Sequence, residues 1–232
     1  MSTLQRLYWG WKWFNHREKY PVNHFGHDFI FYVDTLLDIT RAETLIHEKE
    51  CCKWLLYEEN GVFWDIGSYH GHYAIIADKL GFKSYAFEPL DENLEILYRN
   101  KSLNESNISI HNMALGDENK NIQIHYDESS AEGEVIENKG HIQMYQGDNI
   151  LNLNSICKPT HIKIDTEGYE INVLHGLTHT LGTVKKILIE IHDEGDLNTV
   201  INILETNDFH TFIDNDIRSE TYVMGDKNDK EI

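Results

Sequence analysis

Apolar runs and helix-spaced apolar positions alternate through the middle of the chain. Short apolar runs predict buried strands at residues 62–66, 84–87, 108–113, 161–165 and 187–191. Apolar residues at helical spacing predict helices at residues 72–80, 91–103, 170–181 and 197–205. Because strands alternate with helices, the predicted fold class is α/β: a doubly wound, mainly parallel sheet with helices on both faces.

The pattern changes between the third and fourth predicted strands. Residues 122–126 and 141–145 are strand-like and flank the polar run 127–140, which predicts a hairpin-like insertion lying over a ligand site. Residues 41–59 predict a helix that leads into the first strand.

The pattern also divides the chain into three parts. We expect an N-terminal extension at 1–40, one domain at 41–224 and a disordered charged tail at 225–232. Apolar residues of the extension follow helical spacing: Leu4, Leu7, Tyr8, Trp11 and Phe14. This stripe favours packing on the domain itself, with a pocket cover, a dimer contact or a membrane surface as alternatives.

Composition and charge restrict the partners. The chain has 232 residues, of which 41% are hydrophobic, enough for one sizeable core. Its net charge of −19 repels a phosphate backbone, so no nucleic acid is expected, although the first twenty residues, with four basic side chains against Glu18, carry +3.

Cysteine usage and hydropathy bear on location. The three cysteines include no CxxC spacing and indicate a reducing compartment, and no run of 18 apolar residues predicts a transmembrane segment. The prediction is a cytoplasmic protein, with a homo-oligomer left open.

The first strand ends in an unusual loop. Two glycines, Gly67 and Gly71, allow a tight turn after Asp65, and the following helix directs free N–H groups at the loop. Glu88 ends the second strand 21 positions after Gly67, near the offset at which a carboxylate binds a ribose diol. Together these features suit an adenosine-containing cofactor.

The loop chemistry distinguishes between cofactors. A dinucleotide fingerprint needs G-x-G-x-x-G, whereas this loop has G-x-x-x-G, and Asp65 would repel a pyrophosphate. The same carboxylate would attract the ammonium and sulfonium of S-adenosylmethionine. A tight strand-to-helix turn without a cofactor is the structural alternative, and an NAD-dependent oxidoreductase is the alternative enzyme class.

A larger ordered set of residues resembles a known family. The set comprises Asp65-Ile66-Gly67 with Gly71, Glu88-Pro89, Asn93, Leu97, Asn100, Ala114-Leu115-Gly116, the stretch from Lys163 to Glu170, Val173-Leu174-His175-Gly176 and Glu190. It resembles the FkbM family of S-adenosylmethionine-dependent methyltransferases over about residues 62–192. The resemblance implies a class I methyltransferase (Rossmann-like) fold with strand order 3-2-1-4-5-7-6. It also implies methyl transfer, usually to oxygen on a small molecule or sugar.

The resemblance assigns cofactor contacts position by position. It places Asp65, Gly67, Ser68 and Gly71 around the methionine end, Glu88 at the ribose, and Asn112, Met113 and Ala114 beside the adenine. Ser68-Tyr69 stands where the family usually has Ala-Asn, so a non-catalytic binding protein that retains the fold is a further alternative.

Acidic residues gather at the predicted ends of the fourth and fifth strands. Asp165, Glu167 and Glu170 are spaced to converge there, and Glu190 and His192 share one face of the neighbouring strand. Methyl transfer to a hydroxyl needs alignment and loss of a proton, for which His192 beside a carboxylate is suited near neutral pH.

Two other readings of this cluster remain open. Asp165 with Glu190 could instead bind a divalent cation such as Mg²⁺, and Glu167 and Glu170 could simply stabilise a helix N-terminus. The prediction is therefore O-methylation of a hydroxyl on a sugar or other small molecule, with catalytic candidates Asp165, Glu167, Glu190 and His192.

Overall fold

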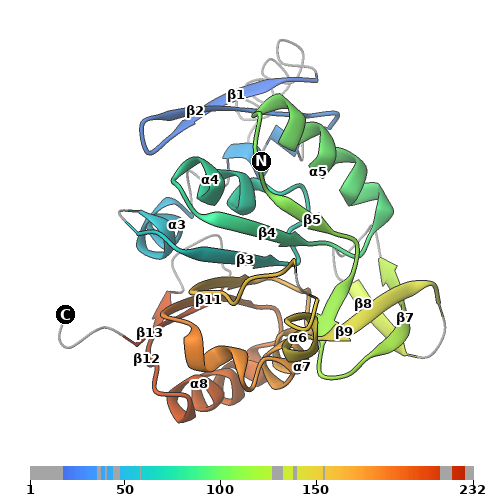
Figure 1. Ribbon diagram of the computed structural model, residues 1–232, viewed down its shortest axis with the longest axis vertical. Helices are drawn as coiled ribbons and strands as arrows, with labels where there is room; N and C mark the ends of the chain where they lie inside the picture. The colour runs from blue at the N-terminus through green and yellow to red at the C-terminus, as the bar shows by residue number, and fades with distance from the viewer. Residues whose placement is uncertain are drawn as a thin grey trace, which may run out of the picture.

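The structure is a computed structural model that describes residues 18–35, 38–39, 41–43, 48–57, 59–126, 133–137, 140–153, 155–214 and 221–227. Its central strands are β3 (Val62–Ile66), β4 (Lys83–Phe87), β5 (Ser109–His111), β10 (His161–Ile164), β11 (Lys186–Ile191), β12 (His210–Asp214) and β13 (Thr221–Asp226). They form a seven-stranded sheet in the order β12-β13-β11-β10-β3-β4-β5 (Figure 1).

The strand directions confirm the predicted architecture. β5, β4, β3, β10 and β11 are parallel, whereas β13 is antiparallel to both β11 and β12. Numbered within the sheet, the order is the implied 3-2-1-4-5-7-6. This arrangement brings the carboxyl ends of β3, β4, β10 and β11 to one edge, where a ligand site is expected.

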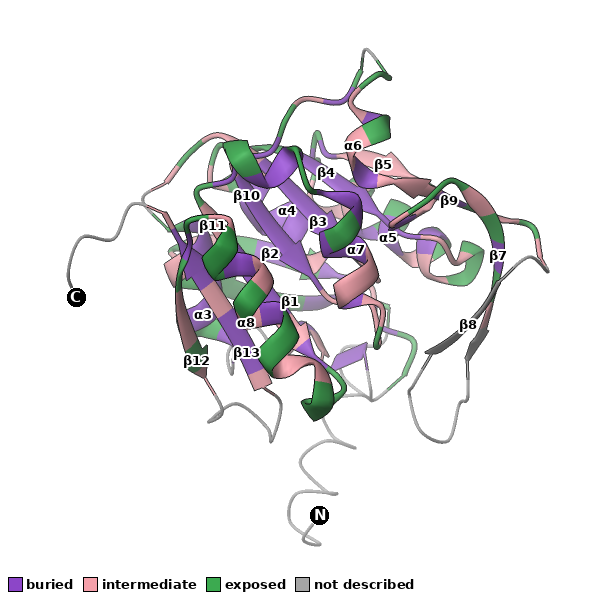
Figure 2. Cartoon of the chain, turned by 90° about the horizontal axis from the view of Figure 1, so that it is seen from below, coloured by how far each residue is buried: buried purple, intermediate pink, exposed green. Residues whose placement is uncertain are grey.

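Helices cover both faces of the sheet. One face carries α3 (Lys49–Leu56), α4 (His72–Lys79) and α5 (Asp91–Leu103), and the other carries α6 (Gly147–Ile150), α7 (Glu170–Gly176) and α8 (Leu197–Thr206) (Figure 1). Successive residues Phe63 and Trp64 of β3 belong to separate hydrophobic clusters on the two faces, and both are fully buried. The sheet is therefore the buried middle layer of the domain (Figure 2).

The insertion is larger than a hairpin. It contains β6 (Ala114–Gly116), β7 (Lys120–Tyr126), β8 (Gly133–Glu137) and β9 (Ile142–Gln146), which form a four-stranded sheet in the order β6-β9-β7-β8. The polar run 127–140 thus contains a strand, β8, that its polar composition did not predict. A Cβ on Gly176 would lie 1.8 Å from the carbonyl oxygen of Gly116, so this sheet docks closely on α7.

An N-terminal hairpin was not predicted. β1 (Tyr20–His24) pairs with β2 (His27–Phe31), and Phe29 and Phe31 enter the same core cluster as α4 and α5. Two side-chain amides at the C-terminal end of α5 hold this hairpin in place. Asn100 Oδ1 accepts from Tyr32 N at 2.6 Å, and Asn104 Oδ1 accepts from Ile30 N at 2.9 Å. This part of the expected extension packs on the domain, whereas the stripe from Leu4 to Phe14 lies outside the described residues.

Several predicted boundaries were wrong. The sequence pattern placed Gly225 and Asp226 in a disordered tail, but both are buried in β13, where they pair with Ile187 and Lys186 of β11. The charged end of the sequence provided no signal for this pairing. The helix expected at 170–181 ends at Gly176, and a 3₁₀ turn at Thr180–Thr183 follows. Of the helix expected at 41–59, the structure has α3 and a separate helical stretch at 41–43.

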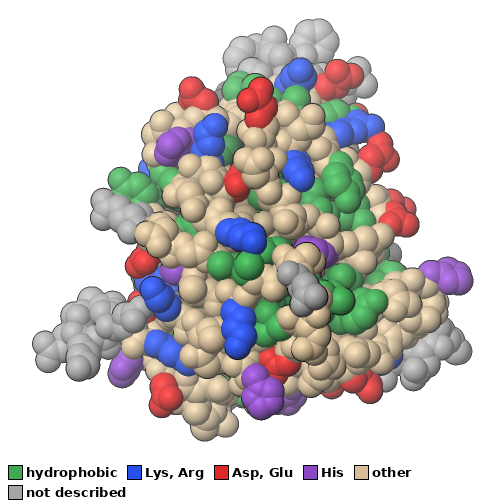
Figure 3. Space-filling model, in the orientation of Figure 1, with side chains coloured by type: hydrophobic (Ala, Val, Ile, Leu, Met, Phe, Trp, Pro, Cys, Tyr) green, Lys and Arg blue, Asp and Glu red, His purple; other side chains and the backbone are tan. Residues whose placement is uncertain are grey.

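Two surface properties complete the fold. None of the helices in the described ranges is both long and apolar enough to cross a membrane. On the face shown in Figure 3, acidic and basic side chains are interspersed, so the acidic excess of the chain does not form a single patch there.

Candidate functional site

The glycine loop after β3 requires glycine at both predicted positions. Gly67 and Gly71 have φ of +76° and +78°, values that side chains with a Cβ rarely adopt. A Cβ on Gly67 would lie 1.8 Å from the carbonyl oxygen of Asp165, and one on Gly71 would lie 2.1 Å from Leu97 Cδ1. The loop therefore runs directly against the end of β10 and against α5.

Asp65 links this loop to the following helix. Its side chain is buried, and Oδ2 accepts a hydrogen bond from the backbone N–H of Ala74 at 3.0 Å. Burial raises the pKa of Asp65 to about 6, although the nearby Lys163 ammonium opposes the shift. One carboxylate oxygen is thus bonded to the first turn of α4.

Glu88 is buried where β4 ends and is held from both sides. Its Oε2 accepts from Tyr69 N at 2.8 Å, and its Oε1 accepts from Leu90 N and from Asn93 Nδ2, both at 3.0 Å. Burial raises the pKa of Glu88 to about 7. These bonds fix the carboxylate beside the glycine loop.

The remaining predicted cofactor residues lie around the same edge. Ser68 is buried, and its hydroxyl has no hydrogen-bond partner within the described ranges, which is uncommon for a buried polar group. Asn112, Met113 and Ala114 connect β5 to β6, next to the backbone contact between Glu88 N and the carbonyl of His111 at 3.1 Å. A ligand hydrogen-bonding group at Ser68 and a ribose at Glu88 fit this donor and acceptor set, so the residues present suit S-adenosylmethionine.

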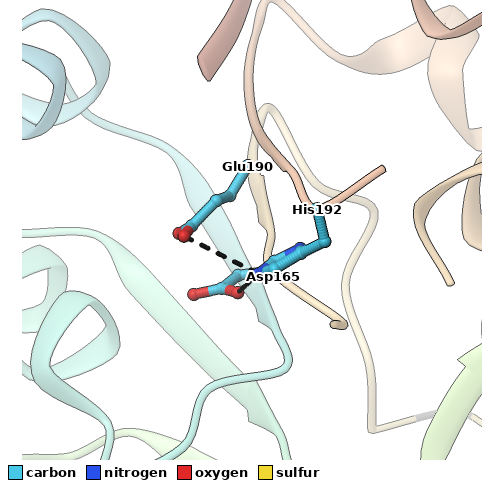
Figure 4. Close-up of side chains that lie close together, drawn as sticks. All are labelled: Asp165, Glu190 and His192. Atoms are coloured by element: carbon cyan, nitrogen blue, oxygen red, sulfur yellow. Dashed lines mark ion pairs between the residues drawn. The ribbon is translucent and has the colours of Figure 1, made fainter. Parts of the chain in front are cut away.

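The acidic cluster predicted from the sequence is assembled around one imidazole. His192 Nδ1 lies 3.1 Å from Glu170 Oε1, and His192 Nε2 lies 3.3 Å from Glu167 Oε2. The same Nε2 is 3.7 Å from both Asp165 Oδ1 and Glu190 Oε1 (Figure 4). These residues come from the ends of β10 and β11 and from the turn into α7, so the predicted convergence is confirmed.

Glu170 has a structural role in the turn. Its Oε1 accepts from the backbone N–H groups of Thr166 at 3.2 Å and Gly168 at 3.0 Å, and the side chain is 1% exposed. Burial opposes its ionisation, but the bond to His192 outweighs this and lowers its pKa. Glu167 is a half-buried residue with φ of +54°, held in the left-handed region by this turn.

The electrostatics of the cluster differ from the simple expectation for His192. Burial disfavours the imidazolium, but the hydrogen bond that it donates to Glu170 and the charges of Asp165 and Glu167 outweigh burial and raise the pKa of His192 to about 9. His192 is therefore charged at neutral pH. Burial raises the pKa of Glu167 to about 7, so this carboxylate, rather than the imidazole, titrates near neutrality.

Lys163 is a buried cation that the sequence analysis quoted in the family motif without giving it a role. Its Nζ lies 2.6 Å from Asp165 Oδ2, and only 4% of the residue is exposed. Burial opposes ionisation of Asp165, but the Lys163 and His192 charges outweigh it and lower its pKa. Residues 163 and 165 are two positions apart in an extended segment and therefore share a face. This spacing could have predicted the ion pair from the sequence.

Asp165, Glu190 and His192 also meet the geometric condition for holding a metal ion. One ligand atom from each lies within 4.8 Å of the others (Figure 4). Tyr222 on β13, which the sequence analysis did not consider, donates to Glu190 Oε2 at 3.2 Å. His192 and Lys163 already place two positive charges against these carboxylates.

Comparison with known proteins identifies a methyltransferase relative and methyltransferases that share the fold. The chain is 28% identical over 205 residues to the hexuronic acid methyltransferase AglP of Haloferax volcanii, covering 86% of this chain and 85% of that protein. A methyltransferase from Pyrococcus furiosus shares the fold with a TM-score of 0.50 at 16% identity, over 97% of this chain and 99% of that one.

A second solved structure also shares the fold. It is the magnesium protoporphyrin IX methyltransferase of Synechocystis, solved with bound S-adenosylmethionine, with a TM-score of 0.50 at 10% identity over 83% of each chain. The family profile described as "Methyltransferase FkbM domain" matches residues 65–224, which is more than half of the chain and includes the glycine loop and the acidic cluster. The chain therefore belongs to the FkbM family of S-adenosylmethionine-dependent methyltransferases.

Proposed function

We propose that this enzyme methylates a hydroxyl oxygen of a hexuronic acid unit in a sugar acceptor. The observation that carries the proposal is the cluster around His192, which stands at the carboxyl ends of β10 and β11 and meets the glycine loop at Asp165. The relative in Haloferax volcanii, a hexuronic acid methyltransferase, supports the acceptor class.

The residues assigned to the cofactor are those at the ends of β3, β4 and β5. Asp65, Gly67, Ser68 and Gly71 would hold the methionine end, Glu88 the ribose, and Asn112, Met113 and Ala114 the adenine side. When bound, S-adenosylmethionine supplies an electrophilic methyl group on a sulfonium. The fixed carboxylate of Glu88 and the buried hydroxyl of Ser68 support this assignment.

The cluster would position the acceptor and take its proton. Because the pKa of His192 is raised to about 9, the imidazolium is a donor at neutral pH and would orient the acceptor oxygen. Glu167, 3.3 Å from His192 and partly accessible, is the carboxylate we assign as general base, and its pKa of about 7 suits that task. Asp165 and Glu190 hold the imidazolium in place, with Lys163 and Tyr222 fixing those carboxylates.

A bound divalent cation is a second means of lowering the hydroxyl pKa at the same place. The grouping of Asp165, Glu190 and His192 favours it, since each offers a ligand atom. However, Mg²⁺ prefers all-oxygen ligands, and the cluster already contains two internal cations. We therefore favour proton transfer to Glu167 without a metal.

Methyl transfer from labelled S-adenosylmethionine to a hexuronic acid glycoside tests the proposal. We expect Glu167→Gln to lower kcat at least about 100-fold while binding of S-adenosylhomocysteine is retained. Glu95→Gln, an exposed glutamate on α5, is the matched control and should leave kcat unchanged.

The stability of the product in alkali identifies the methylated oxygen. A methyl ether resists mild alkali, whereas a methyl ester is cleaved. Recovery of an ester would show that the carboxylate is the methyl acceptor, and since a carboxylate needs no base, it would overturn the role given to Glu167.

A further inference from the structure

Arg41 lies at the site although it is distant from the motif residues in sequence. Its guanidinium carbon is 4.0 Å from the centre of the Tyr69 ring, and the guanidinium donates a hydrogen bond to the Tyr69 hydroxyl. The ring of His70 stacks on Tyr69 with centroids 3.6 Å apart. Tyr69 is itself fixed by the bond from its N–H to Glu88, so Arg41 rests on a rigid part of the cofactor loop.

The charge of Arg41 acts on the acidic turn, and among the described residues it has no carboxylate within ion-pairing distance. The positive charge of Arg41 interacts with Glu167 and lowers the pKa of that carboxyl, whereas burial raises it. Lys163 and His192 each lie within ion-pairing distance of carboxylates. Arg41 has no such pair with a carboxylate in the described part of the chain and is half-buried. A half-buried guanidinium held flat on a ring retains N–H groups for an anion.

We propose that Arg41, supported by Tyr69, binds a carboxylate of a ligand in this site. The inference rests on the proposed function, which supplies two ligands with a carboxylate: the hexuronic acid acceptor and the methionine end of S-adenosylmethionine. An anionic acceptor approaching Asp165, Glu167 and Glu190 meets repulsion, and a guanidinium whose charge acts on Glu167 offsets it. Tyr69 thereby has a role, because its ring and hydroxyl hold the Arg41 guanidinium in position.

Two binding measurements on the full chain distinguish the sources. The first is calorimetric titration with S-adenosylhomocysteine. The second is titration of the S-adenosylhomocysteine complex with a hexuronic acid glycoside, compared with the neutral hexose glycoside of the same configuration. Neither needs turnover, so a failure of methyl transfer would count against the proposed function and leave this test readable.

We expect Arg41→Met to weaken one of these interactions about 10- to 100-fold, as for loss of a hydrogen bond to a charged group. Selective loss of hexuronic acid affinity, with the neutral glycoside unchanged, assigns the acceptor. Loss of S-adenosylhomocysteine affinity assigns the cofactor carboxylate. Unchanged affinity for both ligands would overturn the proposal.

Two further variants control for charge and stacking. Arg99→Met removes an exposed arginine on α5, whose guanidinium carbon lies 4.6 Å from the centre of the Tyr32 ring, and it should change neither affinity. Arg41→Lys keeps the charge without the planar fork, and we expect it to recover part of the lost affinity. If Arg41→Met does not fold, as judged by its thermal unfolding, the comparison of Arg41→Lys with wild type replaces it, and equal affinities would then refute the proposal.

Discussion

The close approach of the glycine loop to β10 predicts an unusually costly glycine substitution. In Gly67→Ala, the new Cβ would lie 1.8 Å from the backbone oxygen of Asp165, and φ there is +76°. Gly26→Ala is the matched control, because φ is +80° and nothing lies within 4 Å of its Cβ. Both variants incur the same backbone strain, so their difference isolates the contact between the two strand ends.

The magnitudes follow from the two effects. Left-handed strain costs about 1–3 kcal/mol at a residue with a side chain, which is the whole expected loss for Gly26→Ala. Overlap with a backbone atom that cannot rotate away adds about 1–3 kcal/mol, giving about 2–6 kcal/mol for Gly67→Ala. Gly71→Ala should fall between them, because the atom it meets is the flexible end of the Leu97 side chain.

Urea denaturation of the three variants measures these losses in free energy of unfolding. Titration with S-adenosylhomocysteine provides a functional readout, and we expect Gly67→Ala to abolish detectable binding because the loop and Asp165 must separate. Equal destabilisation by Gly67→Ala and Gly26→Ala would refute the claim that the loop and the end of β10 are in direct backbone contact.

Three more predictions concern the cofactor, metal and pH. Glu88→Gln should weaken S-adenosylhomocysteine binding about 10-fold in calorimetry, whereas the exposed Glu92→Gln should not; equal affinities would remove Glu88 from the ribose site. Methyl transfer should persist after treatment with EDTA and gel filtration; activity restored only by added Mg²⁺ would establish the metal alternative at Asp165. Burial lowers the pKa of His70 to about 2 and of His72 to about 3. The folded state keeps both imidazoles neutral, so the stability that they contribute above pH 6.5 is lost as the pH falls. Protonation of Asp65 and Glu88, whose pKa values burial raises to about 6 and 7, offsets this loss down to about pH 4. Below that pH the two histidines should reduce the free energy of unfolding by up to about 3 kcal/mol per pH unit, measured by urea titration across pH, and a flat profile would contradict it.

The parallel part of the sheet could be predicted because each strand has a local signal. β3 and α5 have the predicted bounds, since a buried apolar run and a helical stripe are properties of neighbouring residues. The strand Gly133–Glu137 and the hairpin Tyr20–Phe31 were missed, because their pairing partners determine them more than their own composition does.

The same distinction applies to the site. Asp165, Glu190 and His192 lie at the carboxyl ends of β10 and β11, so placing the strands also placed these side chains together. The position of the segment that contains Arg41 depends on packing against residues far away in the sequence. No residue near Arg41 in the sequence indicates that it contacts Tyr69. The pKa of His192 could not be predicted either, since it depends on how many carboxylates surround the ring.

The amides of Asn100 and Asn104 have a consequence for the order of assembly during synthesis. They hold the hairpin β1–β2 across separations of 68 and 74 residues. At about 5–20 residues per second, the hairpin is synthesised about 3–15 s before these amides. A two-stranded hairpin is at best marginally stable alone, so β1 and β2 are made while Phe29 and Phe31 still lack the core that buries them. The N-terminal edge of the domain is therefore made early and completed only after α5, and a nascent chain halted before Asn100 would present this apolar hairpin to chaperones.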